Sequence, residues 1–301
     1  MSFILDPLYQ IVSGVMIGIH TIVAPLFGKD SGVTWTISIM GLVVLIRIIL
    51  IPLFVKQIKS QRAMTALQPQ MKAIQAKYKD DRQKQSEEMM KLYKEHKTNP
   101  LASCFPILAQ APVMFALFTV LNGIAHDKAH GFMKGDYLTS AAAAKFLGAP
   151  ISETFLGTDK TIVKIVTLFL IALMSATTFT TQKQLMTKGM PKMDASNNMM
   201  LQQQKIMLYV FPVIFAISGV NFPVGVLIYW STTNFWTWGQ QFYVIKRNPT
   251  PGSPAYEELQ YKKARKAKAE GHEIAADESP EVPEAPTGQR QQPKKAKKKK
   301  K

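Results

Sequence analysis

The chain has 301 residues, of which 47% are hydrophobic, yet its formal net charge is +17. A chain that is both this apolar and this basic is expected to keep its apolar and basic residues in separate segments. The sequence does so, which indicates a polytopic membrane protein. The single cysteine excludes an intramolecular disulfide, and the five histidines lack metal-ligand spacing. The sequence also lacks the common nucleophile, phosphate-binding and metalloprotease motifs, so we expect no catalytic residue, cofactor or metal.

Residues 1–30 are predicted to be an extracytoplasmic segment. Its apolar stretch, 3–27, is interrupted by polar residues and prolines, and two interpretations stay open. It could cross the membrane, but we favour an amphipathic helix lying in the outer interface. The N-terminus has neither the basic region and cleavage site of a signal peptide nor the composition of a transit peptide, so a bacterial plasma membrane is the expected location.

Five apolar stretches follow, and together they predict an all-α core of five transmembrane helices over residues 31–247. Their expected bounds are 33–55, 101–125, 161–182, 206–220 and 222–245. Four of them are long enough to cross a hydrocarbon core about 30 Å thick. The stretch 206–220 would give only about 22 Å of helix, which would thin the bilayer or tilt neighbouring helices.

The distribution of charge predicts the topology. Basic residues outnumber acidic ones in 56–100, 183–205 and 246–301, but not in 126–160. Positively charged loops stay on the cytoplasmic side. We therefore expect an extracytoplasmic loop at 126–160, a cytoplasmic loop at 183–205, an N-terminus outside and a C-terminus inside.

Residues 56–98 are predicted to form a cytoplasmic helical hairpin, because apolar residues recur at spacings of three and four on either side of a charged break at 79–82. Four methionines lie on its apolar seam: Met64, Met71, Met89 and Met90. They could simply pack the two arms together. Alternatively, they could form an adaptable surface that contacts apolar substrate segments.

Residues 248–301 are predicted to be a disordered basic tail, because Pro, Glu, Ala and Lys dominate there. The candidate contacts are its terminal lysines: Lys294, Lys295, Lys297, Lys298, Lys299, Lys300 and Lys301. These could be a solvated extension, bind anionic lipid or bind the phosphates of ribosomal RNA, and the three alternatives stay open.

Arg47 lies within the first apolar stretch, where a charge costs roughly 2.5 to 3.5 kcal/mol. Eight residues separate it from Val55, about 12 Å of helix, which is long for a side chain that reaches back to the interface. Other polar side chains also fall in the inner halves of the stretches, among them Gln110, Gln182, Ser231 and Asn234. This pattern predicts a wet groove that opens to the cytoplasm and is closed outside, rather than a continuous pore.

These residues lie in motifs that resemble the YidC-type membrane protein insertases of the YidC/Oxa/Alb superfamily, over residues 8–246. The motifs are 46–53, 67–74, 87–94, 99–112, 203–207, 211–215 and 222–225, followed by Tyr229, Trp230 and Asn234. The resemblance implies a groove with a positive charge at Arg47 and a wall around Gln182 and Trp230 to Asn234. We expect a short form without the large extracytoplasmic domain of some members. Cys104 is expected to be a small buried apolar residue rather than a lipid anchor.

The expected function is an insertase and folding chaperone for nascent membrane proteins, which moves their short polar tails or loops into the bilayer through the groove and releases the apolar helix into lipid. An assembly scaffold without translocation activity is the alternative, and an anion or small-solute transporter is a remote one. Membrane lipids are expected partners, and the ribosome and the Sec translocon are further candidates.

Overall fold

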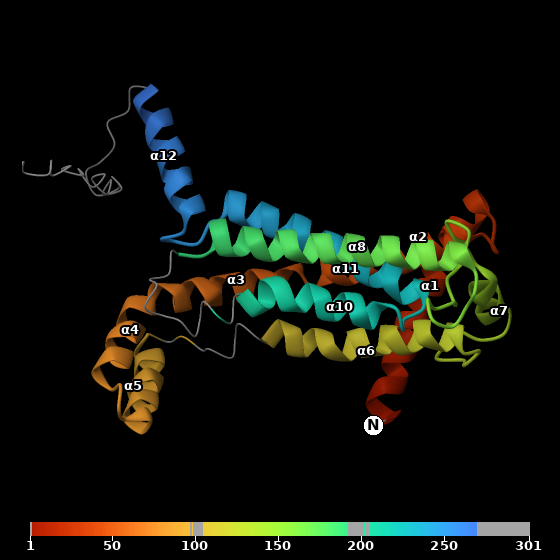
Figure 1. Cartoon of the computed structure of the whole chain (residues 1–301), viewed down its shortest axis with the longest axis horizontal. Coiled ribbons are helices and arrows are strands. Elements are labelled where there is room, and N and C mark those ends of the chain that lie inside the picture. The colour runs from red at the N-terminus through yellow and green to blue at the C-terminus, as the bar shows by residue number, and fades with distance from the viewer. Residues whose placement is uncertain (1, 97, 99–104, 192–201, 203–204, 270–301) are drawn as a thin grey trace, which may run out of the picture. The chain divides into compact units, whose positions relative to one another are not determined.

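The computed structural model describes residues 2–96, 98, 105–191, 202 and 205–269 (Figure 1). This part of the chain is mostly helical, as predicted for an all-α membrane protein. The chain divides into two compact units, Met1–Tyr256 and Glu257–Lys301. The first unit contains all the predicted spans and the candidate site.

The N-terminal residues form one helix, α1 (Ser2–Phe27), which packs against α2 (Gly32–Ile49) and α6 (Phe105–Ala125). Val12 and Met16 of α1 are buried in the core. In Figure 1, α1 runs steeply across the direction of α2 and α6. Its Leu5–Phe27 segment is also long and apolar enough to cross a membrane, so both interpretations of this helix stay predictions.

The first predicted span differs from the structure at its C-terminal end. α2 ends at Ile49, and α3 (Ile51–Ala66) begins immediately after Leu50. Pro52 explains the break, because proline has no N–H and its ring clashes with the carbonyl four residues earlier. The first span therefore continues as α3 into the region predicted as the first arm of the hairpin. The hairpin itself comprises α4 (Gln68–Lys77) and α5 (Arg82–Glu95), which pack together.

The segment between α6 and α8 (Thr161–Gln184) contains α7 (Asp136–Ala143) and an antiparallel pair of strands, β1 (Lys145–Phe146) and β2 (Ala149–Pro150). It is held against the starts of two long helices. Backbone N–H groups of Val224 and Gly225 donate to the carbonyls of Glu153 and Ile151, at 3.0 and 2.8 Å. Gly32 lies so close to this segment that a Cβ there would be 1.8 Å from the carbonyl oxygen of Lys145.

The last elements of the first unit are η2 (Leu185–Gly189), η3 (Ile206–Val210), α10 (Phe211–Gly219) and α11 (Val224–Arg247). Among the described residues, three helical stretches are long and apolar enough to cross a membrane: Leu5–Phe27, Gly32–Ile49 and Thr161–Gly189. Gln110–Ala125 and Ile206–Gly219 are shorter apolar helices. α11 has the length of a span, with 24 residues, but the polar run 231–241 reduces its hydropathy. The count of five spans stays a prediction.

The disorder predicted for 248–301 is wrong for its first part, where residues Pro254–Ala269 form helix α12. Composition concealed a good helix start, because Pro254 is suited to the first turn and Ser253 receives a hydrogen bond from the Tyr256 N–H on its side-chain oxygen, at 3.3 Å. Lys262 also pairs with Glu258 one turn away, at 2.6 Å. The terminal lysines 294–301 lie outside the described residues.

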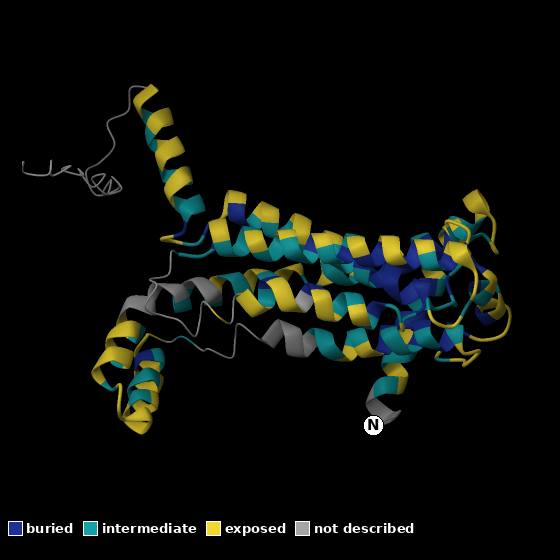
Figure 2. Cartoon of the chain, in the orientation of Figure 1, coloured by how far each residue is buried: buried dark blue, intermediate teal, exposed yellow. Residues whose placement is uncertain are grey.

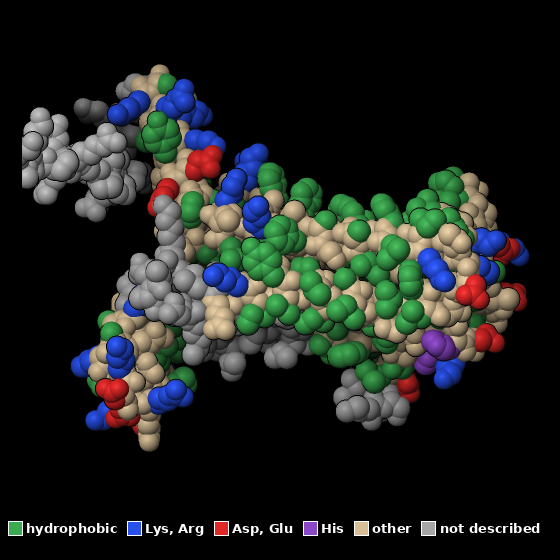
Figure 3. Space-filling view, viewed as in Figure 1, with side chains coloured by type: hydrophobic (Ala, Val, Ile, Leu, Met, Phe, Trp, Pro, Cys, Tyr) green, Lys and Arg blue, Asp and Glu red, His purple; other side chains and the backbone are tan. Residues whose placement is uncertain are grey.

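The core lies where α1, α2, α6, α8 and α11 meet near α7, and buried residues are concentrated there (Figure 2). Fully buried side chains come from each of these helices: Met16, Trp35, Val120, Val163 and Leu227. Apolar side chains also cover the outward face of α8 and α10 (Figure 3). Ile165, Leu168, Val213 and Ile217 are all more than half exposed, at 57%, 53%, 56% and 67%. Such a surface is typical of helices that contact lipid.

Candidate functional site

Arg47 lies in the last turn of α2, half-buried between α6 and α11. A cavity of about 10 Å³ separates it from its neighbours, and Gln110, Tyr229 and Thr233 contribute the polar groups of the lining. That volume is close to the minimum for one water molecule. The Oε1 atom of Gln110 is buried and has no hydrogen-bond partner in the structure. A buried acceptor without a partner favours a site that holds water or a polar guest.

The positive charge of Arg47 has no anionic partner in the described part of the chain. Residues 31–79 and 195–256 contain no aspartate or glutamate. The described ion pairs join Lys160 to Glu153 and Lys262 to Glu258, and neither involves Arg47. An unpaired charge in a low-dielectric environment is costly, so the site has a strong electrostatic preference for an anion.

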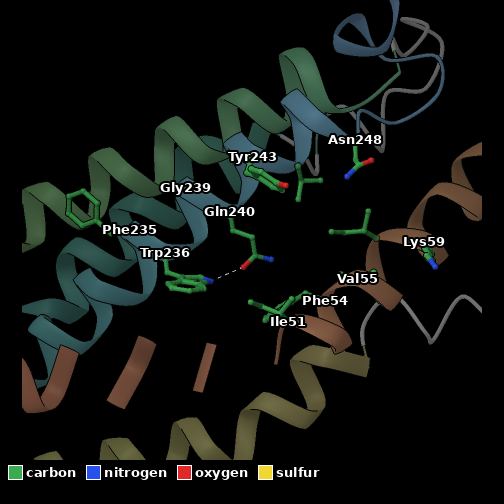
Figure 4. Close-up of a pocket in the computed structure, with 12 residues that line it drawn as sticks. Ile51, Phe54, Val55, Lys59, Phe235, Trp236, Gly239, Gln240, Tyr243 and Asn248 are labelled. Carbon is green, nitrogen blue, oxygen red and sulfur yellow. Dashed lines mark hydrogen bonds between the residues drawn. The ribbon is translucent and has the colours of Figure 1, made fainter. Parts of the chain in front are cut away.

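Phe54 contacts Arg47 and also lines a second, larger cavity. The guanidinium carbon of Arg47 lies 5.5 Å from the centre of the Phe54 ring. Phe54 also lines a cavity of about 620 Å³ between α3 and α11 (Figure 4). Apolar and aromatic side chains dominate that lining, with Lys59, Gln240 and Asn248 as its polar members. The indole N–H of Trp236 donates to Gln240 Oε1 at 3.0 Å.

The structure brings only some of the predicted groove residues together. Gln110 lies beside Arg47, and Ser231 is buried with its Oγ unpaired in the structure. Trp230 packs instead between the rings of Phe215 and Phe222, with centroid distances of 5.6 and 5.0 Å. Gln182 and Asn234 are half-buried, and neither lines the two cavities described above.

Sequence reasoning does not single out two residues beside Arg47, Tyr229 and Thr233 of α11. Thr233 falls within the predicted groove wall from Trp230 to Asn234, and Tyr229 belongs to the motifs that carry the family resemblance. Residues four apart lie on the same face of a helix. The signal that could have found the pair is therefore their spacing.

The hairpin methionines differ in exposure. Met71 is half-buried, and its sulfur accepts a hydrogen bond from the Tyr93 hydroxyl at 3.8 Å. Met64, which was predicted on the hairpin, lies instead on α3 and is half-buried, as is Met89 on α5. Met90 is 51% exposed. Burial raises the pKa of the Tyr93 hydroxyl. Met71 thus packs within the hairpin, and Met90 is the methionine that a partner could reach.

Metal binding finds no support in the described residues, since they contain no group of three or more His, Cys, Asp or Glu side chains able to hold an ion. The polar chemistry of the site consists of one arginine, amide groups and hydroxyl groups. Such groups can attract and hydrogen-bond a polar segment.

Comparisons with known proteins agree with the motifs described above. The family model of the 60 kDa inner membrane protein matches residues 26–251. A membrane protein insertase YidC of Streptomyces avermitilis is 55% identical over 263 residues, which cover 84% of this chain and 60% of the relative. The corresponding protein of Tropheryma whipplei is 34% identical over 270 residues, which cover 84% of this chain and 87% of the relative.

One solved structure has a similar fold, with a TM-score of 0.51 and 24% identity over 77% of this chain and 46% of that chain. It is described as an active YidC insertase with the first transmembrane domain resolved. This chain thus spans about 60% of the Streptomyces relative and less than half of the crystallised one. The family match over residues 26–251 and the identity to both relatives show that the chain is a bacterial integral membrane protein that belongs to the family of YidC-type membrane protein insertases.

Proposed function

We propose that this protein is a membrane protein insertase that captures a polar, preferably acidic, tail or loop of a nascent membrane protein at Arg47. The observation that carries this proposal is the unpaired Arg47 charge beside the unpaired Oε1 of Gln110. Coulomb attraction between unit charges 4 Å apart is about 4 kcal/mol at an effective dielectric of 20. That attraction would offset much of the cost of moving a carboxylate out of water.

The site must open for this capture. A cavity of about 10 Å³ holds at most one water molecule, and a carboxylate is larger. α2, α6 and α11 therefore separate around Arg47 when a substrate arrives. Such opening is feasible because most of the side chains around Arg47, among them Ile46, Gln110 and Thr233, are half-buried, whereas Trp35 and Val163 in the core are fully buried.

The apolar part of the substrate then leaves along α8 and α11 into lipid. Support comes from the outward face of α8, where Ile162, Ile165, Leu168 and Phe169 are exposed. Burial of apolar surface in lipid supplies the free energy for this step. In this scheme the membrane contains five spans with the N-terminus outside and the C-terminus in the cytoplasm. The ribosome, the Sec translocon and anionic lipid are further partners of this scheme.

Reconstitution into liposomes tests the proposal. The purified protein is given a single-span substrate with an acidic N-terminal tail, and insertion is scored by protection of that tail from protease. We expect protection of the tail with the wild type and a large loss of protection with Arg47→Ala. Lys164→Ala is the matched control, because it removes one positive charge near the start of α8 and should leave protection unchanged. If substrate binds but its tail stays sensitive in the wild type, the protein is an assembly scaffold rather than an insertase.

A further inference from the structure

The cavity between α3 and α11 is separate from the space beside Arg47. Its volume of about 620 Å³ lies in the range of small-molecule and cofactor sites, roughly 300 to 1,000 Å³. Arg47 does not line it. The capture of a polar tail at Arg47 therefore leaves this cavity without a role.

Gly239 keeps the cavity open. Glycine within a helix lowers helix stability relative to alanine, and close packing usually accounts for it in membrane helices. Gly239 has no such neighbour, because a Cβ added there would meet no atom within 4 Å. It lines the cavity on α11, so the missing side chain contributes empty space rather than a tight contact.

The cavity is apolar at one end and polar at the other (Figure 4). Ile51, Phe235 and Trp236 lie toward one end of the cavity, and Lys59, in the middle of α3, and Asn248, directly after α11, lie toward the other. Phe235 and Asn248 are 13 positions apart, which corresponds to about 20 Å of helix. One leaflet of a hydrocarbon core about 30 Å thick is about 15 Å deep, so the cavity is long enough to hold most of an acyl chain.

The charge around the polar end selects an anion. Neither 31–79 nor 195–256, the segments that contain α3 and α11, has an acidic residue. Five basic residues lie along α3 and at the end of α11: Lys56, Lys59, Arg62, Lys246 and Arg247. Lys59 is exposed and lines the cavity directly.

A polypeptide fits the apolar end poorly, because its backbone N–H and carbonyl groups would need partners there. The Trp236 N–H and Gln240 Oε1 already bond to each other. An acyl chain has no polar groups to satisfy. The occupant is therefore apolar along most of its length and negatively charged at one end.

We propose that this cavity binds one acyl chain of an anionic phospholipid, with its phosphate at Lys59. That the lipid comes from the inner leaflet rests on the topology in the proposed function. The binding of the lipid does not depend on that topology. A lipid held here would contact Phe54, whose ring stacks on Arg47. Lipid occupancy would thus fix the ring against which the arginine packs.

Native mass spectrometry of the full-length protein in detergent tests the proposal. The protein is titrated with phosphatidylglycerol or with phosphatidylcholine, and bound lipids are counted. We expect one tightly bound phosphatidylglycerol, with at least tenfold weaker phosphatidylcholine binding. Gly239→Leu should fill the cavity and abolish this binding. Gly18→Leu is the matched control, since a Cβ at this other helical glycine also meets nothing within 4 Å.

Lys59→Ala separates the headgroup from the chain. It should reduce phosphatidylglycerol affinity about fivefold or more and leave phosphatidylcholine binding unchanged, whereas Lys94→Ala on α5 should change neither. Equal retention of lipid by Gly239→Leu and Gly18→Leu would overturn the proposal, as would equal affinity for the two lipids. Insertion activity is not measured, so failure of the insertase proposal would leave these results interpretable.

Discussion

The Arg47 guanidinium carbon and the centre of the Phe54 ring are 5.5 Å apart, although the helix breaks between them at Leu50. Seven residues correspond to nearly two turns, so both side chains lie on one face of an α-helix. The break at Pro52 does not disturb this register, since the N–H of Leu50 still donates to Ile46 and that of Phe54 to Leu50. The ring therefore stabilises a cation that has no carboxylate partner in the described residues.

Removal of the Phe54 ring should loosen Arg47. We expect Phe54→Leu to destabilise the protein by about 0.5 to 2 kcal/mol, the value of a cation–π contact, and Phe54→Tyr to retain most of the stability because its ring has the same negative face. Thermal unfolding in detergent measures the difference. Equal stability of the Leu and Tyr variants would show that the ring acts only by filling space.

Substitutions of two hairpin methionines should distinguish a role in packing from a role in substrate contact. Met71→Ser should destabilise the hairpin by roughly 1 to 3 kcal/mol, because a half-buried apolar side chain that accepts the Tyr93 hydrogen bond is lost. Met90→Ser should leave stability unchanged but reduce crosslinking of a nascent chain to the hairpin. Normal crosslinking by Met90→Ser would assign the methionines to packing alone. Hydrogen exchange of α4 and α5 reports the stability.

Glu153 should make the loop 126–160 sensitive to acid. Burial would raise the pKa of its carboxyl, but hydrogen bonds from Lys160 and Thr158 and nearby positive charge outweigh burial and hold the pKa below its ordinary value of 4.5. A lowered pKa in the folded state stabilises the protein above the unfolded-state pKa, and this contribution is lost as the pH falls through the folded-state pKa. When the pH is lowered below about 4.5, the unfolding temperature should therefore decrease.

The matched variants for this test are Glu153→Gln and Asp159→Asn, an exposed carboxylate in the same loop. Glu153→Gln should unfold at a lower temperature at pH 7 and lose part of the acid dependence. Asp159→Asn should keep the wild-type profile. The same acid dependence in both variants would contradict this role for the Lys160–Glu153 pair.

Hydrophobic pattern and charge predicted the helical membrane class, because it depends on long segments whose composition is averaged over many residues. The family was indicated separately, by the resemblance of several ordered motifs. Local details were less accessible. The break at Leu50 depends on one proline within an apolar run, and α12 depends on a cap at Ser253 that composition conceals. The partners of Arg47 come from α6 and α11, which are distant in sequence, so only their packing brings Gln110 and Tyr229 to it.

The final prediction concerns Arg47, for which electrostatic capture and structural clamping give different results. If capture depends on charge, Arg47→Lys should keep most insertion activity, because a point charge is sufficient. Arg47→Ala should then lower the insertion of acidic-tailed substrates more than that of other substrates. Arg47→Glu should repel acidic tails. If Arg47 instead fixes α6 and α11 through its planar fork, lysine cannot replace it, and all three variants should reach lower folded levels.

Insertion and protein abundance must therefore be measured together for the three variants, with an acidic-tailed substrate and a neutral-tailed one. A Coulomb contribution of about 4 kcal/mol corresponds to several hundredfold in substrate affinity, so a charge effect would be large for the acidic tail and small for the neutral one. A stably folded Arg47→Glu variant that inserts both substrates equally well would refute electrostatic capture. The family membership would stand, and the polar groups of Gln110 and Thr233 would then have to carry the recognition by hydrogen bonds alone.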